Sequence, residues 1–191
     1  MFTLPTWGGV DWFGCEDDLE WGPLDGVLAE DDRDLPATGT PIHATRSSSV
    51  SPTRRVLILD VENICPGSRR TVRALTQLRA VLKAAGPVDQ IIAASAANQH
   101  ARLDQLLRMV GVHVHTCVKN RPNAADRALI QAARRFAADG DCEVILASND
   151  HGFRRIARMP GVRRVVLITV PHLATARSLI RAVDELRVAA A

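Results

Sequence analysis

The stretch VLILDVEN, residues 56–63, decides the fold. Four apolar residues in a row are typical of a strand that is buried on both faces, as strands are in a parallel sheet. The run then reaches an acid, Asp60, and burial of a lone carboxylate is unfavourable unless something pairs with it. This one stretch therefore predicts both a parallel sheet and a polar site at the end of a strand.

The rest of the chain alternates between strand and helix patterns. Strands are expected at 56–61, 91–96, 112–118, 143–148 and 165–170. Between them, apolar residues recur at helical spacing, which predicts helices from Ser68 to Gly86, over 98–110 and 123–138, just after Asp150, and over 173–189. Such alternation predicts an α/β fold with a doubly wound, parallel, five-stranded sheet and right-handed crossovers.

The two parts of the chain differ in charge. Residues 1–52 are rich in acids, Gly and Pro and carry all three tryptophans, which predicts a disordered tail and linker before an α/β domain at 53–191. Residues 1–50 hold ten acids against two bases, whereas residues 51–191 hold 11 acids against 22 bases. A basic domain favours a polyanionic partner such as a nucleic acid. We expect the acidic tail either to associate with the basic domain or to recruit a protein.

The cysteine pattern and the chain start indicate the compartment. The four cysteines are scattered without a C-x-x-C pair, the N-terminus lacks the features of a signal peptide, and no apolar run approaches the ~20 residues that span a bilayer. We expect a cytoplasmic protein that does not bind a membrane. The exposed edges of the predicted sheet would allow a homodimer.

Three acids fall where ligands bind in open α/β sheets, beyond the carboxyl ends of the strands. Asp60 ends the first strand, Asp126 lies in the first turn of the helix after the third, and Asp150 follows the fourth. Each has a local alternative. Asp60 could be held by backbone N–H groups at a turn, Asp126 is spaced for a capping box with Asn123, and Asp150 can cap a short helix. Together, however, they would repel one another unless a cation lay among them. Carboxylate oxygens suit Mg²⁺ or Mn²⁺, which can activate a water for attack on a phosphodiester.

The segments LILDVEN, NAADRALIQAA and LASNDHGF, in this order and on these elements, resemble the PIN-like nucleases, particularly their NYN branch. The resemblance covers about 54–170 and implies strand order 3-2-1-4-5 and metal-dependent ribonuclease activity that leaves 5′-phosphate ends. It implies that Asp60, Asp126 and Asp150 bind the metal, with Asn63 as a companion amide and Ser148 as a hydroxyl beside the last acid. One position departs from the pattern: Gly152 stands where many NYN members have a further acid, so the site has fewer carboxylates.

Basic residues near the same edge are candidates for contacts with backbone phosphates, which carry no sequence information. The core has only two aromatic residues, Phe136 and Phe153, so base stacking is poorly supported and recognition should follow backbone and shape. RNA is the expected partner and DNA the alternative. The candidate phosphate ligands are Arg69, Arg70, Lys119, Arg121, Arg127 and Arg154.

A second cluster of polar residues alternates along the third strand. His113, His115 and Cys117 share one strand face, which could form a zinc site. A half-polar face of an edge strand with a small buried thiol is the favoured interpretation, because no fourth ligand or supporting carboxylate is evident.

Two other functions remain open. In a phosphatase resembling the haloacid dehalogenase family, Asp60 would be the nucleophile and Glu62 the acid two residues on, although that family prefers Asp at the second position. The chain could also be a catalytically inactive module that binds RNA or a protein through the same groove. A phosphomonoesterase assay and a metal titration would separate these readings.

Overall fold

The computed structural model describes residues 53–65, 71–171 and 173–190. The predicted tail at 1–52 lies outside these residues, and so do the expected helix start at Ser68 and two of the expected phosphate ligands, Arg69 and Arg70.

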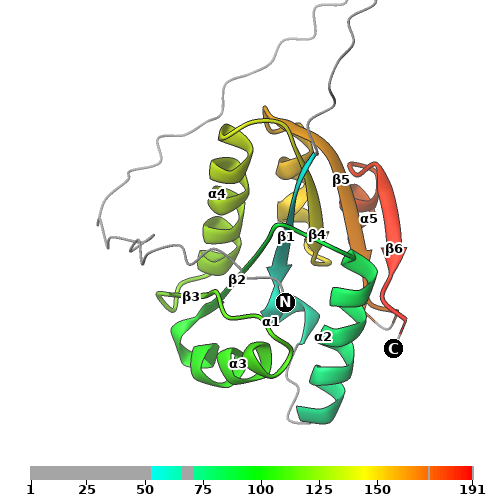
Figure 1. The fold of residues 1–191 in the computed structure, drawn as a ribbon. Coiled ribbons are helices and arrows are strands. Elements are labelled where there is room, and N and C mark those ends of the chain that lie inside the picture. Colours follow the sequence, from blue (N-terminus) through cyan, green and yellow to red (C-terminus); the bar gives the residue numbers. More distant parts are fainter. Residues whose placement is uncertain (1–52, 66–70, 172, 191) are drawn as a thin grey trace, which may run out of the picture. The chain divides into compact units, whose positions relative to one another are not determined.

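The described part of the chain is an α/β fold built on a parallel sheet in the order β3-β2-β1-β4-β5-β6 (Figure 1). The predicted order 3-2-1-4-5 is confirmed, and one further strand extends it. β1 lies in the middle, between β2 and β4, with Leu59 in register with both Ala93 and Ala147. The strands are β1 (Arg54–Asp60), β2 (Gln90–Ala96), β3 (His115–Val118), β4 (Cys142–Ala147), β5 (Val162–Thr169) and β6 (Glu185–Val188).

The helix predicted over 173–189 is wrong. That segment forms only a single helical turn, α5 (Arg177–Ile180), followed by β6. Long-range bonds replace the helical ones: β6 pairs with β5 from Glu185 to Val188, and the Asp184 carboxylate accepts a 2.7 Å bond from the Val165 amide. The Arg187 guanidinium also donates to the carbonyl of Ala84 at 3.0 Å. Tertiary pairing thus overrides a local helical preference.

Helices cover both faces of the sheet. One face carries α1 (Val61–Ile64), α2 (Thr71–Ala85) and α3 (Ala97–Met109), and the other carries α4 (Ala124–Ala138), the 3₁₀ helix η1 (His151–Arg158) and α5. The expected short helix after Asp150 is therefore present, as η1. α2 ends before Gly86, whose φ of 69° continues the chain in the left-handed region.

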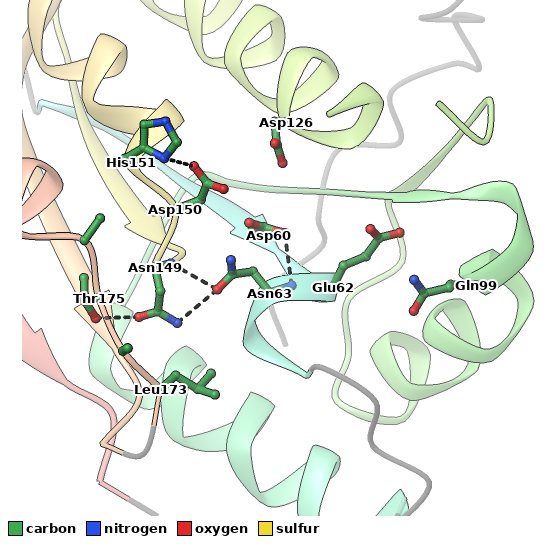
Figure 2. Close-up of a pocket in the computed structure, with 12 residues that line it drawn as sticks. Asp60, Glu62, Asn63, Gln99, Asp126, Asn149, Asp150, His151, Leu173 and Thr175 are labelled. Atoms are coloured by element: carbon green, nitrogen blue, oxygen red, sulfur yellow. Dashed lines mark hydrogen bonds and ion pairs between the residues drawn. The ribbon is translucent and has the colours of Figure 1, made fainter. Parts of the chain in front are cut away.

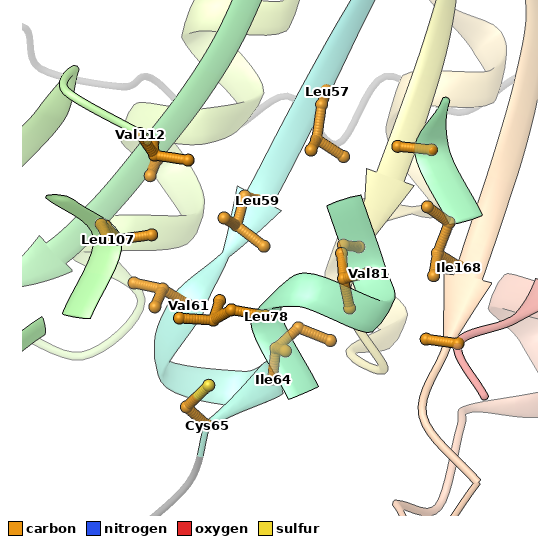
Figure 3. Packing of buried hydrophobic residues seen from close by; sticks show 14 of the residues in the cluster. Leu57, Leu59, Val61, Ile64, Cys65, Leu78, Val81, Leu107, Val112 and Ile168 are labelled. Atoms are coloured by element: carbon orange, nitrogen blue, oxygen red, sulfur yellow. The ribbon is translucent and has the colours of Figure 1, made fainter. Parts of the chain in front are cut away.

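β1 supplies both halves of the core, because its side chains alternate between the two faces. Leu57 and Leu59 pack with Leu78 and Val81 of α2 on one face (Figure 3), while Ile58 packs toward α4 on the other. These side chains are fully buried, and truncating one of them to Ala would cost about 2–5 kcal/mol. The central strand is thereby held rigidly up to its last residue, Asp60. None of the helices in the described ranges is both long and apolar enough to cross a bilayer.

Candidate active site

An open pocket lies at the carboxyl edge of the sheet, where the three acids were expected (Figure 2). It has a volume of about 810 Å³, and acids from three separate segments face it. The lining residues are Asp60, Glu62, Asn63, Gln99, Asp126, Asn149, Asp150, His151, Leu173, Ala174, Thr175 and Ala176.

Asp60 ends β1 and lies at the floor of this pocket, with only 3% of its surface exposed. One carboxylate oxygen accepts a hydrogen bond from the Ser148 hydroxyl at 2.8 Å, and the other accepts one from the backbone amide of Asn63 at 3.2 Å. The second bond caps α1, so the turn after β1 is closed by the acid itself. Ser148 does not line the pocket; it lies buried beneath Asp60 and orients it.

The loop after β4 is bonded to the loop after β1 through amides. The side-chain oxygen of Asn63 accepts from the Asn149 backbone amide at 3.2 Å and from the Asn149 side chain at 3.0 Å. Thr175 in turn donates to the Asn149 side-chain oxygen at 2.7 Å. The expected companion amide, Asn63, therefore lies in the site and holds the neighbouring loop in place.

Asp150 faces the same pocket and also caps η1, so the local alternative for this residue holds as well. One of its oxygens accepts a 2.7 Å bond from the Gly152 amide and lies 3.2 Å from Nδ1 of His151. A Cβ added at Gly152 would lie only 3.2 Å from that oxygen. A glycine therefore fits this tight turn around Asp150 better than the acid that many NYN members have at this position.

Asp126 projects into the pocket from the first turn of α4 (Figure 2). The alternative of a capping box fails, because Asn123 adopts a left-handed conformation with φ 57° and its side chain makes no capping bond. Asp126 is therefore left to face the other acids.

A fourth acid, Glu62, completes the ring of carboxylates and was missed as a member of this site. It lines the pocket, and one of its oxygens accepts a 2.6 Å bond from the Ala96 amide at the end of β2. The sequence analysis gives Glu62 a role only in the phosphatase alternative, as the acid two residues after Asp60. The single-turn helix α1, which turns Glu62 toward β2, was not evident from the sequence.

The acids perturb one another. Burial raises the pKa of Asp60 to about 7, and repulsion from Asp126 and Glu62 adds to the shift against the bond from Ser148. Burial also raises the pKa of Asp126, and repulsion from Asp150 and Glu62 contributes. Burial is the larger cause of both shifts, and the repulsion among the acids adds to it.

The residues fit a hard divalent cation. The donors are carboxylate and amide oxygens, the set preferred by Mg²⁺ and Mn²⁺. Within the described ranges, no three acids of the pocket have carboxylate oxygens that all lie within 4.8 Å of one another. Water would therefore have to fill part of the coordination sphere. Mg²⁺ commonly keeps several waters in this way.

The four expected phosphate ligands within the described residues do not line the pocket. Lys119, Arg121, Arg127 and Arg154 are all exposed outside it, and Arg127 donates to the carbonyl of Pro122 at 3.1 Å. No described Lys or Arg side chain lines the pocket.

The polar residues of the third strand are arranged differently from the expected set. β3 is an edge strand, as expected, but Cys117 is exposed rather than buried, and His113 is exposed before the strand begins. His115 instead meets His100 and Asp104 of α3. The carboxylate that seemed to be missing comes from a helix.

Comparisons with known proteins agree with this fold. The family model described as "NYN domain" matches residues 55–189. A crystal structure of a Vibrio parahaemolyticus protein of unknown function is similar with a TM-score of 0.51 and 24% identity, covering 71% of this chain and 92% of that one. That likeness supports the fold alone. The search of curated proteins gives no match.

Proposed function

The chain belongs to the NYN domain family, a family of PIN-like nucleases, and on this premise we propose that it is a metal-dependent ribonuclease that hydrolyses RNA phosphodiester bonds. The observation that carries the proposal is the set of acids in the pocket. Asp60, Glu62 and Asp126 have no ion pair with a Lys or Arg among the described residues, and the pKa values of Asp60 and Asp126 are raised.

Each residue of the site has a role in this proposal. Asp60, Asp126 and Asp150 would hold Mg²⁺ or Mn²⁺, whose chemistry is to lower the pKa of a bound water and to neutralise charge on the phosphate. Ser148 orients Asp60 through its 2.8 Å bond. Asn63 keeps the loop that carries Asp150 beside the loop after β1.

The substrate is proposed to be RNA, with DNA as the alternative. The basic residues Lys119, Arg121, Arg127 and Arg154, and also Arg69 and Arg70, would contact backbone phosphates. Such contacts position a nucleic acid without reading its sequence.

The phosphatase alternative is disfavoured by the environment of Asp60. A nucleophilic carboxylate must reach the phosphorus atom, but this one is 3% exposed and both of its oxygens accept hydrogen bonds. Those bonds suit a residue that is held in place as a ligand. The inactive-module alternative predicts binding without cleavage.

The test is an assay of the full chain on labelled single-stranded and structured RNA with Mg²⁺, Mn²⁺ or a chelator. We expect cleavage that requires the metal and leaves 5′-phosphate ends, no activity on a phosphomonoester, and loss of cleavage in Asp60→Asn. Cleavage that survives chelation would overturn the proposal. RNA binding without any cleavage would favour the inactive module.

The tail and the compartment complete the proposal. Cys65, Cys117 and Cys142 are free thiols, which suits the reducing cytoplasm. If the acidic tail competes with nucleic acid for the basic domain, deleting residues 1–50 should raise RNA affinity at low salt. Unchanged affinity at low salt would show that the tail does not compete.

A further inference from the structure

A second cluster of metal-ligating side chains lies beside β3, outside the pocket. His100 and Asp104 are one turn apart on α3, and His115 opens β3. One ligand atom from each of the three lies within 4.8 Å of the others. None of the three lines the acidic pocket.

The three side chains are already in contact. The rings of His100 and His115 stack with centroids 4.2 Å apart and planes inclined by 28°. Asp104 places one oxygen 3.6 Å from Nδ1 of His115, and its other oxygen accepts a 2.7 Å bond from Arg108. The Ser95 hydroxyl lies 3.4 Å from Nδ1 of His100.

His115 provides an independent sign that something is bound here. Its side chain is fully buried, yet neither ring nitrogen has a hydrogen-bond partner in the described part of the chain. A buried polar atom without a partner is unfavourable, and such atoms are rare in folded proteins. A ligand that accepts the lone pair of one nitrogen would remove part of that cost.

The donor set selects the class of ligand. Two imidazoles and one carboxylate suit a borderline divalent ion such as Zn²⁺ better than Mg²⁺. Tetrahedral Zn²⁺ needs its ligand atoms about 3.3 Å apart, against the present separation of at most 4.8 Å. Because a ring nitrogen binds a metal in the plane of its ring, the stacked His100 and His115 rings would also have to turn toward the ion.

We propose that His100, Asp104 and His115 bind a Zn²⁺ ion, with water as the fourth ligand, and that this ion ties the edge strand β3 to α3. In zinc sites, neighbouring residues usually orient the ligands through hydrogen bonds. Here Arg108 contacts Asp104 and Ser95 contacts His100 in this way.

The site is also linked to the acidic pocket through α3. Gln99, the residue before His100, lines the pocket, and the Ala96 amide just before the helix holds Glu62. An ion bound at His100 would therefore hold the start of the helix that forms this wall. The inference does not depend on the ribonuclease proposal, because it concerns different ligands.

Zinc titration of the chelator-treated full chain by isothermal calorimetry tests the proposal. We expect a Zn²⁺ site outside the acidic pocket, and His100→Gln and Asp104→Asn should each weaken it by at least about 10-fold. His113→Gln is the matched control, because His113 is an exposed histidine two residues from His115 and should bind Zn²⁺ like the wild type. Asp60→Asn should also retain the site, which separates it from the acidic pocket.

A thermal melt gives a second readout. At Zn²⁺ concentrations about 100 times the Kd, binding should raise the Tm of the wild type by roughly 5–10 °C and that of His100→Gln much less. His100 and Asp104 are half-buried on α3, so circular dichroism should be used to verify that these variants fold. The proposal would be overturned if the wild type did not bind Zn²⁺, or if His100→Gln and Asp104→Asn bound Zn²⁺ as tightly as the wild type does.

Discussion

The two ends of the sheet treat their acids in opposite ways. At the amino ends of the strands, acids pair with arginine: Glu143 lies 3.3 Å from Arg55, and Asp141 pairs with Arg163. The hydrogen bond from Arg163 holds the pKa of Asp141 below its usual range. At the carboxyl ends, the pKa values of Asp60 and Asp126 are raised instead.

This difference teaches where the molecule bears an electrostatic cost. The chain has many arginines and places several of them at the amino ends, so a shortage of bases does not explain why no Lys or Arg among the described residues lines the pocket. A buried carboxylate close to like charges is unfavourable until a cation or a proton joins it. The carboxyl edge is therefore the place where a missing positive charge would be most stabilising.

The largest effect should come from neutralising an acid at the carboxyl ends of the strands. Asp126→Asn and Asp150→Asn should each reduce RNA cleavage on the order of 10³-fold, as removal of a group that supports transition-state charge does. Asp141→Asn, the matched change at the amino end, should leave the rate unchanged. Single-turnover rates at saturating Mg²⁺ provide the comparison, and equal losses at both ends would remove the distinction.

Metal affinity should depend on pH through Asp60. Because its pKa is about 7 without metal, protons compete with the cation below neutrality. Affinity should rise about 10-fold per pH unit between pH 5 and 7 and level off above. Calorimetric titrations with Mn²⁺ at several pH values would measure this slope. A flat profile over that range would show that Asp60 is not a ligand.

Stability without metal should fall as the pH rises from about 4 to 7. The folded state holds the Asp60 proton in this window while the unfolded state releases it, so a raised pKa destabilises the fold with increasing pH. The cost at neutral pH is on the order of a few kcal/mol. Urea unfolding with a chelator should show this slope in the wild type and in Asp141→Asn, and a shallower slope in Asp60→Asn, where only the raised pKa of Asp126 remains. An unchanged slope in Asp60→Asn would contradict the assignment.

The smallest effect is expected for Glu62. Its bond from the Ala96 amide can be kept by Gln, so Glu62→Gln removes charge with little change in shape. We expect about a 10-fold loss in metal affinity and a lower pKa for Asp126, as one source of repulsion is gone. Nuclear magnetic resonance titration of the Asp126 carboxyl would follow the pKa. An unchanged pKa would separate Glu62 from the site.

The positions of the acids were predictable because they depend on connectivity. Parallel strands end at one edge of the sheet, so Asp60, Asp126 and Asp150 meet there however the intervening helices pack. β6 was not predictable in this way, since its stability comes from pairing with β5 and not from its own sequence pattern. His115 shows the same limit: its partners, His100 and Asp104, are separated from it in the sequence and meet it only when α3 packs beside β3.

The central claim is that the acids at the carboxyl edge hold a divalent cation. Mn²⁺ binding, followed by the electron paramagnetic resonance signal of the free ion, tests it at pH 7.5 in a His100→Gln background that disables the second cluster. The account predicts a bound ion that is lost in Asp60→Asn and retained in Asp141→Asn. Equal Mn²⁺ binding by these two variants would contradict it.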